Sequence, residues 1–161
     1  MKNIKNFFYK YTKVILVTEL IILAIMSARL FLPYRSVDTD LQPYFDSYMS
    51  AVTTICKENQ YYQPRRIIIK FDKLTRPTIG RCSSGLMDYT IKVDREYWKS
   101  ANEEDRAELM FHELAHCVID QDHSEDMLNY MSPEKMYDID MHTLVKQVGF
   151  DIAIHCMSSK E

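Results

Sequence analysis

The 161-residue sequence contains very little glycine, and its three glycines, Gly80, Gly85 and Gly149, form no phosphate-binding motif. A loop that holds phosphate groups needs several closely spaced glycines, so nucleotide-binding sites of that kind are excluded. An excess of basic residues is also missing, because 20 Lys and Arg stand against 23 Asp and Glu, with a formal net charge of −3. Without a basic surface, nucleic acid is not an expected partner.

The four cysteines, Cys56, Cys82, Cys117 and Cys156, include no C-x-x-C pair. This absence argues against a zinc ribbon and against a thioredoxin-like redox site. If the domain lies outside the cytosol, the even number permits two disulfides, in one of three connectivities. Cys82 with Cys117 is one candidate pair. In a cytosolic protein, all four would instead be reduced, buried thiols.

The beginning of the chain differs from the rest in composition. Residues 1–13 carry four lysines and no acidic residue, and residues 14–33 are mostly apolar. A helix over the apolar run would be about 28 Å long, close to the hydrocarbon thickness of a bilayer. Glu19 and Arg29 weaken this interpretation, because a charge is costly at the bilayer centre. We expect a transmembrane signal anchor or a signal peptide, followed by one domain over residues 34–161.

Lysines on the amino-terminal side favour an orientation with the N-terminus inside and the following domain outside the cytoplasm. The alternative is a secreted or periplasmic protein, released by cleavage near Met26-Ser27-Ala28. A buried amphipathic helix is a third interpretation, which the small amount of polar surface in this segment disfavours.

Residues 112–116, His-Glu-Leu-Ala-His, have the form H-E-x-x-H. On a helix, two imidazoles four residues apart point the same way and can bind one zinc ion, with the glutamate facing the water that zinc polarises. A capping box at Ser100 and Glu103 predicts that this helix begins near Ala101. The alternative interpretation is a solvent-exposed helix face that carries two histidines among acidic residues and binds no metal. The apolar stripe on the opposite side of the helix consists of Ala107, Phe111, Leu114 and Val118.

Catalytic zinc usually takes three protein ligands and leaves the fourth position for water, so a third donor should follow the helix. Metzincin proteases have the pattern H-E-x-x-H-x-x-G-x-x-H, whose glycine position is here Ile119 and whose third ligand is Asp122. Isoleucine tolerates positive φ badly. A loop one residue longer puts Asp120 at the turn, where aspartate tolerates the left-handed conformation better, and brings in His123. We therefore favour His123 over Asp122 as the third ligand.

Residues 111–123, F-H-E-L-A-H-C-V-I-D-Q-D-H, resemble the segment H-E-L-G-H-C-x-L-G-x-x-H of small metallopeptidases of phages and bacteria, which are similar to minimal metzincins. Ala115 and Asp120 stand where that group often has glycine. Residues 129–133, N-Y-M-S-P, resemble the Met-turn that passes beneath the zinc, with Met131 as its methionine, although an ordinary core or turn methionine would fit too. The resemblance implies a minimal zincin-like α+β domain with a small mixed sheet, an active-site helix, a Met-turn and a C-terminal helix.

Residues 88–94 alternate apolar and polar side chains, which is typical of an edge strand with one wet face. By the resemblance, this strand borders the cleft and can bind a peptide through backbone hydrogen bonds; otherwise it is an ordinary half-buried strand. Trp98 is expected in the core, and His142 and His155 at the surface. Spacing and composition further predict helices over about 41–57 and 138–154, a strand over 66–72, and a loop over 75–85 with a brief strand around Ile79.

Together these patterns predict a zinc-dependent metallopeptidase acting on a peptide or protein substrate. Zn²⁺ held by His112, His116 and His123 would lower the pKa of its bound water toward neutrality and polarise the scissile carbonyl. Glu113 would accept the water proton and deliver it to the leaving amine. One alternative is a zincin of another class, with Glu134 as third ligand. The other is a membrane-anchored binding protein without enzymatic activity, in which the metal is structural or absent.

Overall fold

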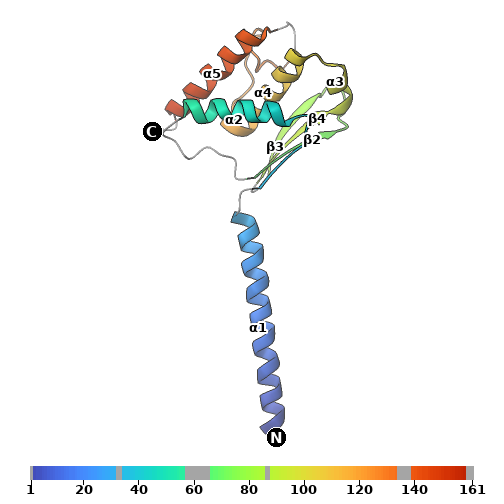
Figure 1. Ribbon diagram of the computed structural model, residues 1–161, viewed down its shortest axis with the longest axis vertical. Helices are drawn as coiled ribbons and strands as arrows, with labels where there is room; N and C mark the ends of the chain where they lie inside the picture. Colours follow the sequence, from blue (N-terminus) through green and yellow to red (C-terminus); the bar gives the residue numbers. More distant parts are fainter. Residues whose placement is uncertain (1, 32–33, 57–65, 86–87, 134–138, 159–161) are drawn as a thin grey trace. The chain divides into compact units, whose positions relative to one another are not determined.

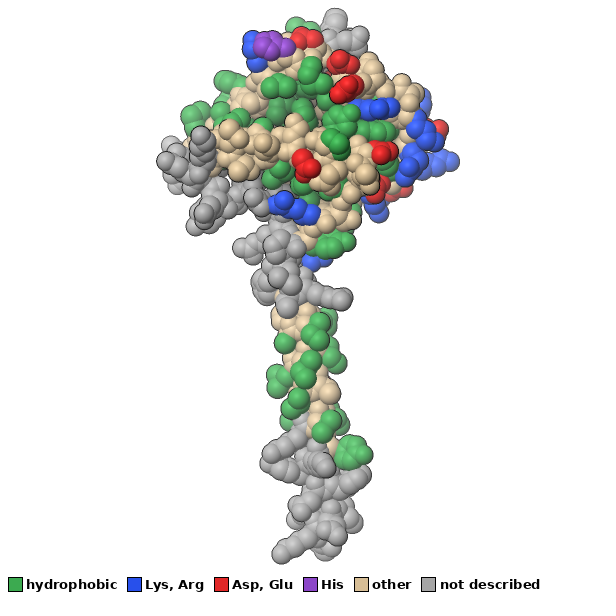
Figure 2. All heavy atoms as spheres, viewed as in Figure 1, with side chains coloured by type: hydrophobic (Ala, Val, Ile, Leu, Met, Phe, Trp, Pro, Cys, Tyr) green, Lys and Arg blue, Asp and Glu red, His purple; other side chains and the backbone are tan. Residues whose placement is uncertain are grey.

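The computed structural model of the chain describes residues 2–31, 34–56, 66–85, 88–133 and 139–158, in two compact units, Met1–Pro33 and Tyr34–Glu161 (Figure 1). The first unit holds one long helix, α1 (Lys2–Phe31). Its described apolar side chains are more than half exposed, and Figure 2 shows them along the helix.

Among the described residues, no helix combines the length and the apolar character needed to cross a membrane. The predicted transmembrane helix is therefore without support from the structure. Its orientation and its cleavage stay predictions.

The second unit is built on a mixed four-stranded sheet with the strand order β1-β2-β4-β3. The run of three isoleucines in β2 explains its central position, because Ile67 and Ile69 are buried and pair with Tyr89 and Ile91 of β4. The α+β class and the strand at 66–72 are thus confirmed. The strands are β1 (Tyr34–Val37), β2 (Arg66–Asp72), β3 (Gly80–Ser84) and β4 (Tyr89–Asp94), of which only β3 runs antiparallel to its neighbour.

The prediction of an edge strand at 88–94 is wrong, because β4 pairs with β2 on one side and with β3 on the other. Alternation along the chain shows that a strand has one buried face, here Ile91 and Val93, but it carries no information about the number of hydrogen-bonded neighbours. The edges of the described sheet are β1 and β3. The edge beside α4 is β3, whose sequence G-R-C-S-S lies within the segment predicted to be mostly loop.

The helices α2 (Gln42–Ile55), α4 (Glu103–Ile119) and α5 (Met141–Ser158) form a layer on the sheet, and a short helix α3 (Arg95–Ser100) precedes α4 (Figure 1). Helix α4 lies at the centre, since it contacts β3 and β4 as well as α2 and α5. All four residues of its predicted apolar stripe are buried, as is Trp98 of α3. The helix predicted over 138–154 begins at Met141 and ends at Ser158.

The capping box predicted at Ser100 and Glu103 does not form. Ser100 is the last residue of α3, and its hydroxyl donates to the carbonyls of Glu96 and Tyr97. The N-cap of α4 is Asn102, whose side-chain oxygen accepts a hydrogen bond from the N–H of Asp105 at 2.8 Å. Helix α4 therefore begins two residues later than the sequence predicted.

Two disulfides use all four cysteines. Cys56 and Cys156 join the ends of α2 and α5, and Cys82 and Cys117 join the edge strand β3 to α4. The second bridge confirms the candidate pair, and four reduced thiols are excluded. Cross-links of this kind stabilise a small domain, typically by about 2–4 kcal/mol each.

Candidate active site

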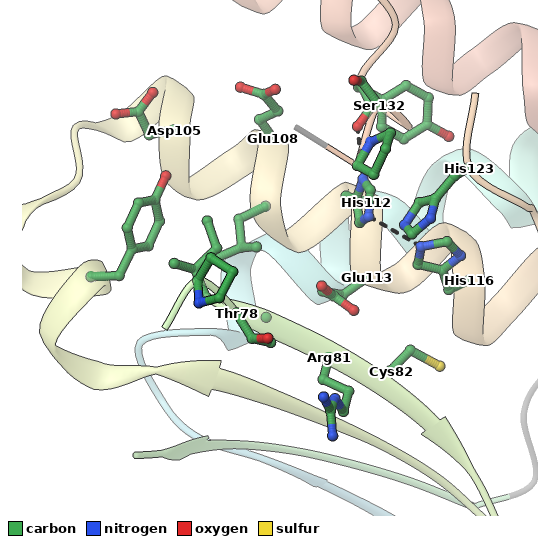
Figure 3. Close-up of a pocket in the computed structure, with 17 residues that line it drawn as sticks. Thr78, Arg81, Cys82, Asp105, Glu108, His112, Glu113, His116, His123 and Ser132 are labelled. Atoms are coloured by element: carbon green, nitrogen blue, oxygen red, sulfur yellow. Dashed lines mark hydrogen bonds between the residues drawn. The ribbon is translucent and has the colours of Figure 1, made fainter. Parts of the chain in front are cut away.

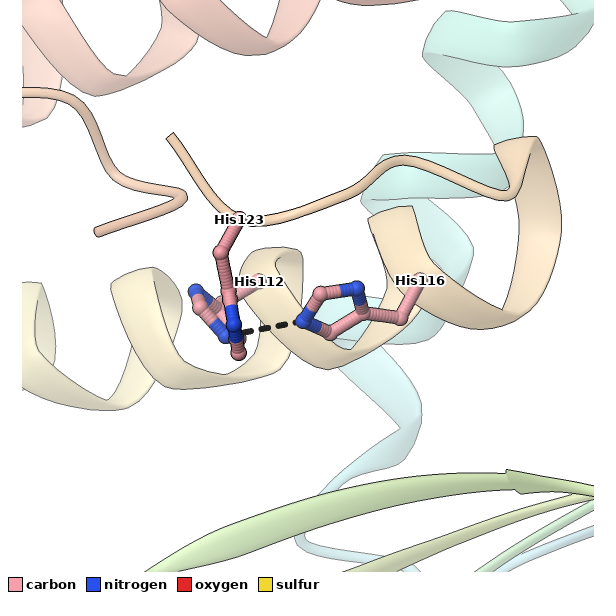
Figure 4. Close-up of side chains that lie close together, drawn as sticks. All are labelled: His112, His116 and His123. Atoms are coloured by element: carbon pink, nitrogen blue, oxygen red, sulfur yellow. Dashed lines mark hydrogen bonds between the residues drawn. The ribbon is translucent and has the colours of Figure 1, made fainter. Parts of the chain in front are cut away.

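Three imidazoles meet beside the C-terminal half of α4 (Figure 4). The ligand nitrogens of His112, His116 and His123 all lie within 4.8 Å of one another, and the Nε2 atoms of the first two are 3.1 Å apart. His112 and His116 are one helical turn apart on α4, and His123 comes from the segment that follows. A group of three imidazoles at this spacing can hold a metal ion.

A left-handed residue at the end of α4 brings His123 to the other two histidines. Asp120 has φ 53° and ψ 38°, as predicted, and the N–H of Gln121 reaches back to the carbonyl of Ala115 at 3.2 Å. The chain then returns along the helix, so that the His123 ring lies 4.7 Å from that of His116 and 5.2 Å from that of His112, between centroids.

Neither of the two weaker candidates for the third ligand is seen in this group among the residues that the structure describes. Asp122 is exposed and is not among the residues whose donor atoms converge. Glu134 lies outside the described residues. The structure thus brings together the ligand set that the sequence favours, while its use as a ligand set stays a prediction.

Backbone carbonyls fix the orientation of the two helical histidines. The Nδ1 of His112 lies 2.8 Å from the carbonyl oxygen of Tyr130, and the Nδ1 of His116 contacts that of Gln121. A carbonyl oxygen can only accept, so Nδ1 carries the proton in both rings and the Nε2 lone pair remains for a metal. Such outer contacts are usual for histidines that bind metals.

Burial keeps both helical histidines neutral. It lowers the pKa of His112 to about 4, against the opposing effect of the Tyr130 carbonyl, and it lowers the pKa of His116 as well. A histidine must be neutral to bind a metal, so at neutral pH neither side chain has to lose a proton first.

Glu113 points from α4 toward β3, beside Arg81 and Cys82 (Figure 3). Its side chain is buried, and burial raises its pKa to about 7, although a hydrogen bond from the backbone N–H of Cys82 and the charge of Arg81 act in the opposite direction. A carboxyl group that titrates near neutral pH at the wall of a cleft is typical of a general base.

Gly80 of β3 is a site residue that the sequence did not reveal. A Cβ atom at this position would lie 2.5 Å from Oε1 of Glu113 and 2.7 Å from Cδ1 of Leu109. The edge strand can therefore approach α4 this closely only because Gly80 has no side chain. Two residues further on, the disulfide of Cys82 ties the same strand to Cys117, next to His116.

We expect Gly80→Ala to lower the free energy of unfolding by about 1–3 kcal/mol, the usual cost of an extra methyl group in a well-packed site. Gly149→Ala is the matched control, because its Cβ would meet only Cδ1 of Ile55, at 4.0 Å, in the interior of α5. There alanine should stabilise the protein by up to about 1 kcal/mol. Urea unfolding measures both changes, and equal effects of the two substitutions would disprove the steric role of Gly80.

A cleft of about 750 Å³ is lined by the three histidines and Glu113. One wall consists of residues 77–82, the other of α4 residues between Asp105 and His116, and residues 130, 132 and 133 close it beside His123. Its volume lies within the range of sites that bind small ligands or a few residues of a peptide.

Met131 is fully buried, and its carbonyl oxygen accepts a hydrogen bond from the N–H of Ser124 at 2.9 Å. Through the adjacent Tyr130 carbonyl, this segment also contacts His112. These contacts place the segment near the histidines but do not identify a Met-turn, which stays a prediction.

A family model for putative phage metallopeptidases matches residues 51–152, which is more than half of the chain and includes β2, β3, β4, α4 and the three histidines. No curated protein and no solved structure gives a significant match. The description of this family agrees with a histidine group that can hold a metal. By the extent of this match, the chain belongs to the putative phage metallopeptidase family.

Proposed function

We propose that the protein is a zinc-dependent metallopeptidase that hydrolyses peptide bonds in the cleft between β3 and α4. The observation that supports this most directly is the convergence of three imidazoles within 4.8 Å, with the buried carboxyl of Glu113 on the same helix as two of them. Membership of the family supports the same reaction class.

The donor set favours zinc among the common metals. Zinc sites that catalyse reactions commonly have three protein ligands, often all histidine, and keep a fourth position for water or substrate. Calcium and magnesium prefer oxygen ligands, which this group lacks. The residues therefore fit Zn²⁺, held by Nε2 of His112 and His116 and by the ring of His123.

When bound, zinc would polarise the scissile carbonyl and lower the pKa of the attacking water. The chain's own part in the reaction is proton transfer. In this proposal, the Glu113 carboxylate accepts the proton of the attacking water and then donates it to the leaving amine. The Cys82 N–H and the close approach of Gly80 hold this carboxyl against β3, so little reorientation is needed during the reaction.

The edge strand β3 is the proposed binding site for the peptide backbone. Among the described strands it pairs only with β4, and its residues 80–82 line the cleft. An extended peptide can add to such an edge by backbone hydrogen bonds. The peptide-binding role predicted for residues 88–94 is therefore proposed for β3 instead.

We also propose that the domain works outside the cytoplasm, because disulfides persist in oxidising compartments. The basic and apolar composition of residues 1–33 supports the same location. Periplasmic fractionation of cells that produce the tagged protein, with protease accessibility of its C-terminus, tests this location.

The proposed function is tested by removing and restoring the metal. We expect the purified protein to bind one zinc ion, to hydrolyse members of a peptide library, to lose this activity with a chelator and to regain it with added zinc. A hydroxamate should inhibit, because a catalytic site has an open position. If the zinc-loaded protein neither cleaves the library nor binds the hydroxamate, the metal is structural and the binding-protein alternative is correct.

A further inference from the structure

The side chain of Gln147 joins helix α5 to the backbone of the segment after His123. Its Oε1 accepts a hydrogen bond from the N–H of Tyr130 at 3.0 Å, and its Nε2 donates to the carbonyl of Leu128 at 2.9 Å. The oxygen and the nitrogen of one side-chain amide thus both form hydrogen bonds to the same short stretch of backbone, 17 to 19 residues away in the sequence.

The same Tyr130 holds His112. Its carbonyl oxygen accepts from Nδ1 of His112 at 2.8 Å, while its N–H is bound by Gln147. A continuous path of hydrogen bonds therefore leads from α5 through one residue to the ring of a candidate metal ligand. The orientation of that ring depends on where the Tyr130 carbonyl points.

Three other hydrogen bonds in this region connect the segment with itself. The N–H of Met131 donates to Oδ1 of Asn129 at 2.8 Å, the N–H of Ser132 to the carbonyl of Asn129 at 2.9 Å, and the N–H of Ser124 to the carbonyl of Met131 at 2.9 Å. These three bonds shape the turn but do not tie it to a helix. Gln147 ties it to α5, which packs directly against α4.

We propose that Gln147 is a positioning residue for the metal site: it holds the Tyr130 peptide group so that the carbonyl orients the His112 imidazole. This inference rests on the proposed metal-binding function of the three histidines. Without the amide, the 128–130 backbone loses two hydrogen bonds to α5, and the ring of His112 loses a fixed acceptor. Loss of a partner that is hydrogen-bonded directly to a metal ligand commonly weakens metal binding by about 10- to 100-fold, and Gln147 acts on such a partner, the Tyr130 carbonyl.

The test uses the full chain with Gln147→Met, a side chain of similar length that makes neither hydrogen bond. We expect its zinc dissociation constant, measured by competition with a chromophoric chelator, to rise by about tenfold or more. The visible spectrum of bound Co²⁺ should change too. Gln42→Met is the matched control, because the Gln42 amide bonds only to Asp46 on α2 among the hydrogen bonds described, at 2.8 Å, and its zinc affinity should stay within twofold of wild type.

Two further measurements separate this role from a general loss of stability. Gln147→Glu keeps an acceptor for the Tyr130 N–H but replaces the donor to Leu128 by an oxygen that can only accept, so its zinc affinity should also fall below that of wild type; it carries the test if the methionine variant does not fold. In the metal-free protein, the low-field proton resonance of His112 Nδ1–H should be observed in wild type and should broaden in Gln147→Met.

Unchanged zinc affinity and an unchanged His112 resonance in a folded Gln147→Met protein would overturn the inference, even if its melting temperature falls. A wild-type protein that binds no zinc overturns the proposed function instead. In that case the His112 resonance still decides whether Gln147 positions the ring.

Discussion

Glu113→Gln is expected to lower kcat/KM for peptide hydrolysis by about 10²- to 10⁴-fold, the range that a positioned general base contributes. Glutamine has nearly the same shape and can still accept the hydrogen bond from the Cys82 N–H, but it cannot accept the proton of water. Because Glu113 is not one of the converging imidazole ligands, zinc content should stay at the wild-type value. Metal analysis and hydrolysis of one cleaved library peptide measure the two quantities on the same sample.

Glu104→Gln is the matched control, since it makes the same chemical change in the exposed first turn of the same helix. It should retain hydrolysis within about twofold, with at most a small loss of stability from the weaker interaction with the helix dipole. A Glu113→Gln enzyme with more than a tenth of wild-type activity would exclude Glu113 as the base. If the Glu113→Gln protein also lost zinc, the Glu113 carboxylate would instead be part of the metal site.

Local rules predicted the parts of the molecule that local sequence determines. The sequence predicts the left-handed conformation at Asp120 because Ile119 tolerates it badly, and the structure has φ 53° at Asp120. Apolar spacing also predicts the elements β2, β4 and α4, because side chains that recur at the period of a strand or helix lie on one face, and that face packs against the core. The Cys82–Cys117 pair was one of several possible pairs, and only the fold distinguishes between them.

The missed features depend on contacts between distant segments. β1 and β3 are short and mainly polar, and both are strands because of the neighbours with which they pair. Gly80 is required only because β3 passes over Glu113, and a glycine in a loop-like segment gives no sign of this. The role of Gln147 was likewise not readable, since one glutamine in a helix has no periodic signal.

The identity of the third ligand decides between two spacings: His123 fits the longer turn, and Asp122 fits the standard metzincin spacing. We expect His123→Ala to weaken zinc binding by at least about 100-fold, because loss of a direct ligand should exceed the 10- to 100-fold effect of outer contacts. His123 is exposed, so its removal should leave the metal-free fold intact. Competition with a chromophoric chelator gives the dissociation constant, and thermal unfolding of the metal-free protein checks the fold.

Asp122→Ala is the neighbouring control and the direct rival. Its carboxylate is exposed and lies outside the group of converging nitrogens, although its charge acts on His116 and slightly favours the protonated ring. Without that charge, the His116 ring stays in the neutral form that binds a metal, and the exposed charge is screened by salt. Zinc affinity should therefore change by less than about twofold. If Asp122→Ala weakened binding more than His123→Ala, Asp122 would be the ligand, and the left-handed turn at Asp120 would serve only to end α4.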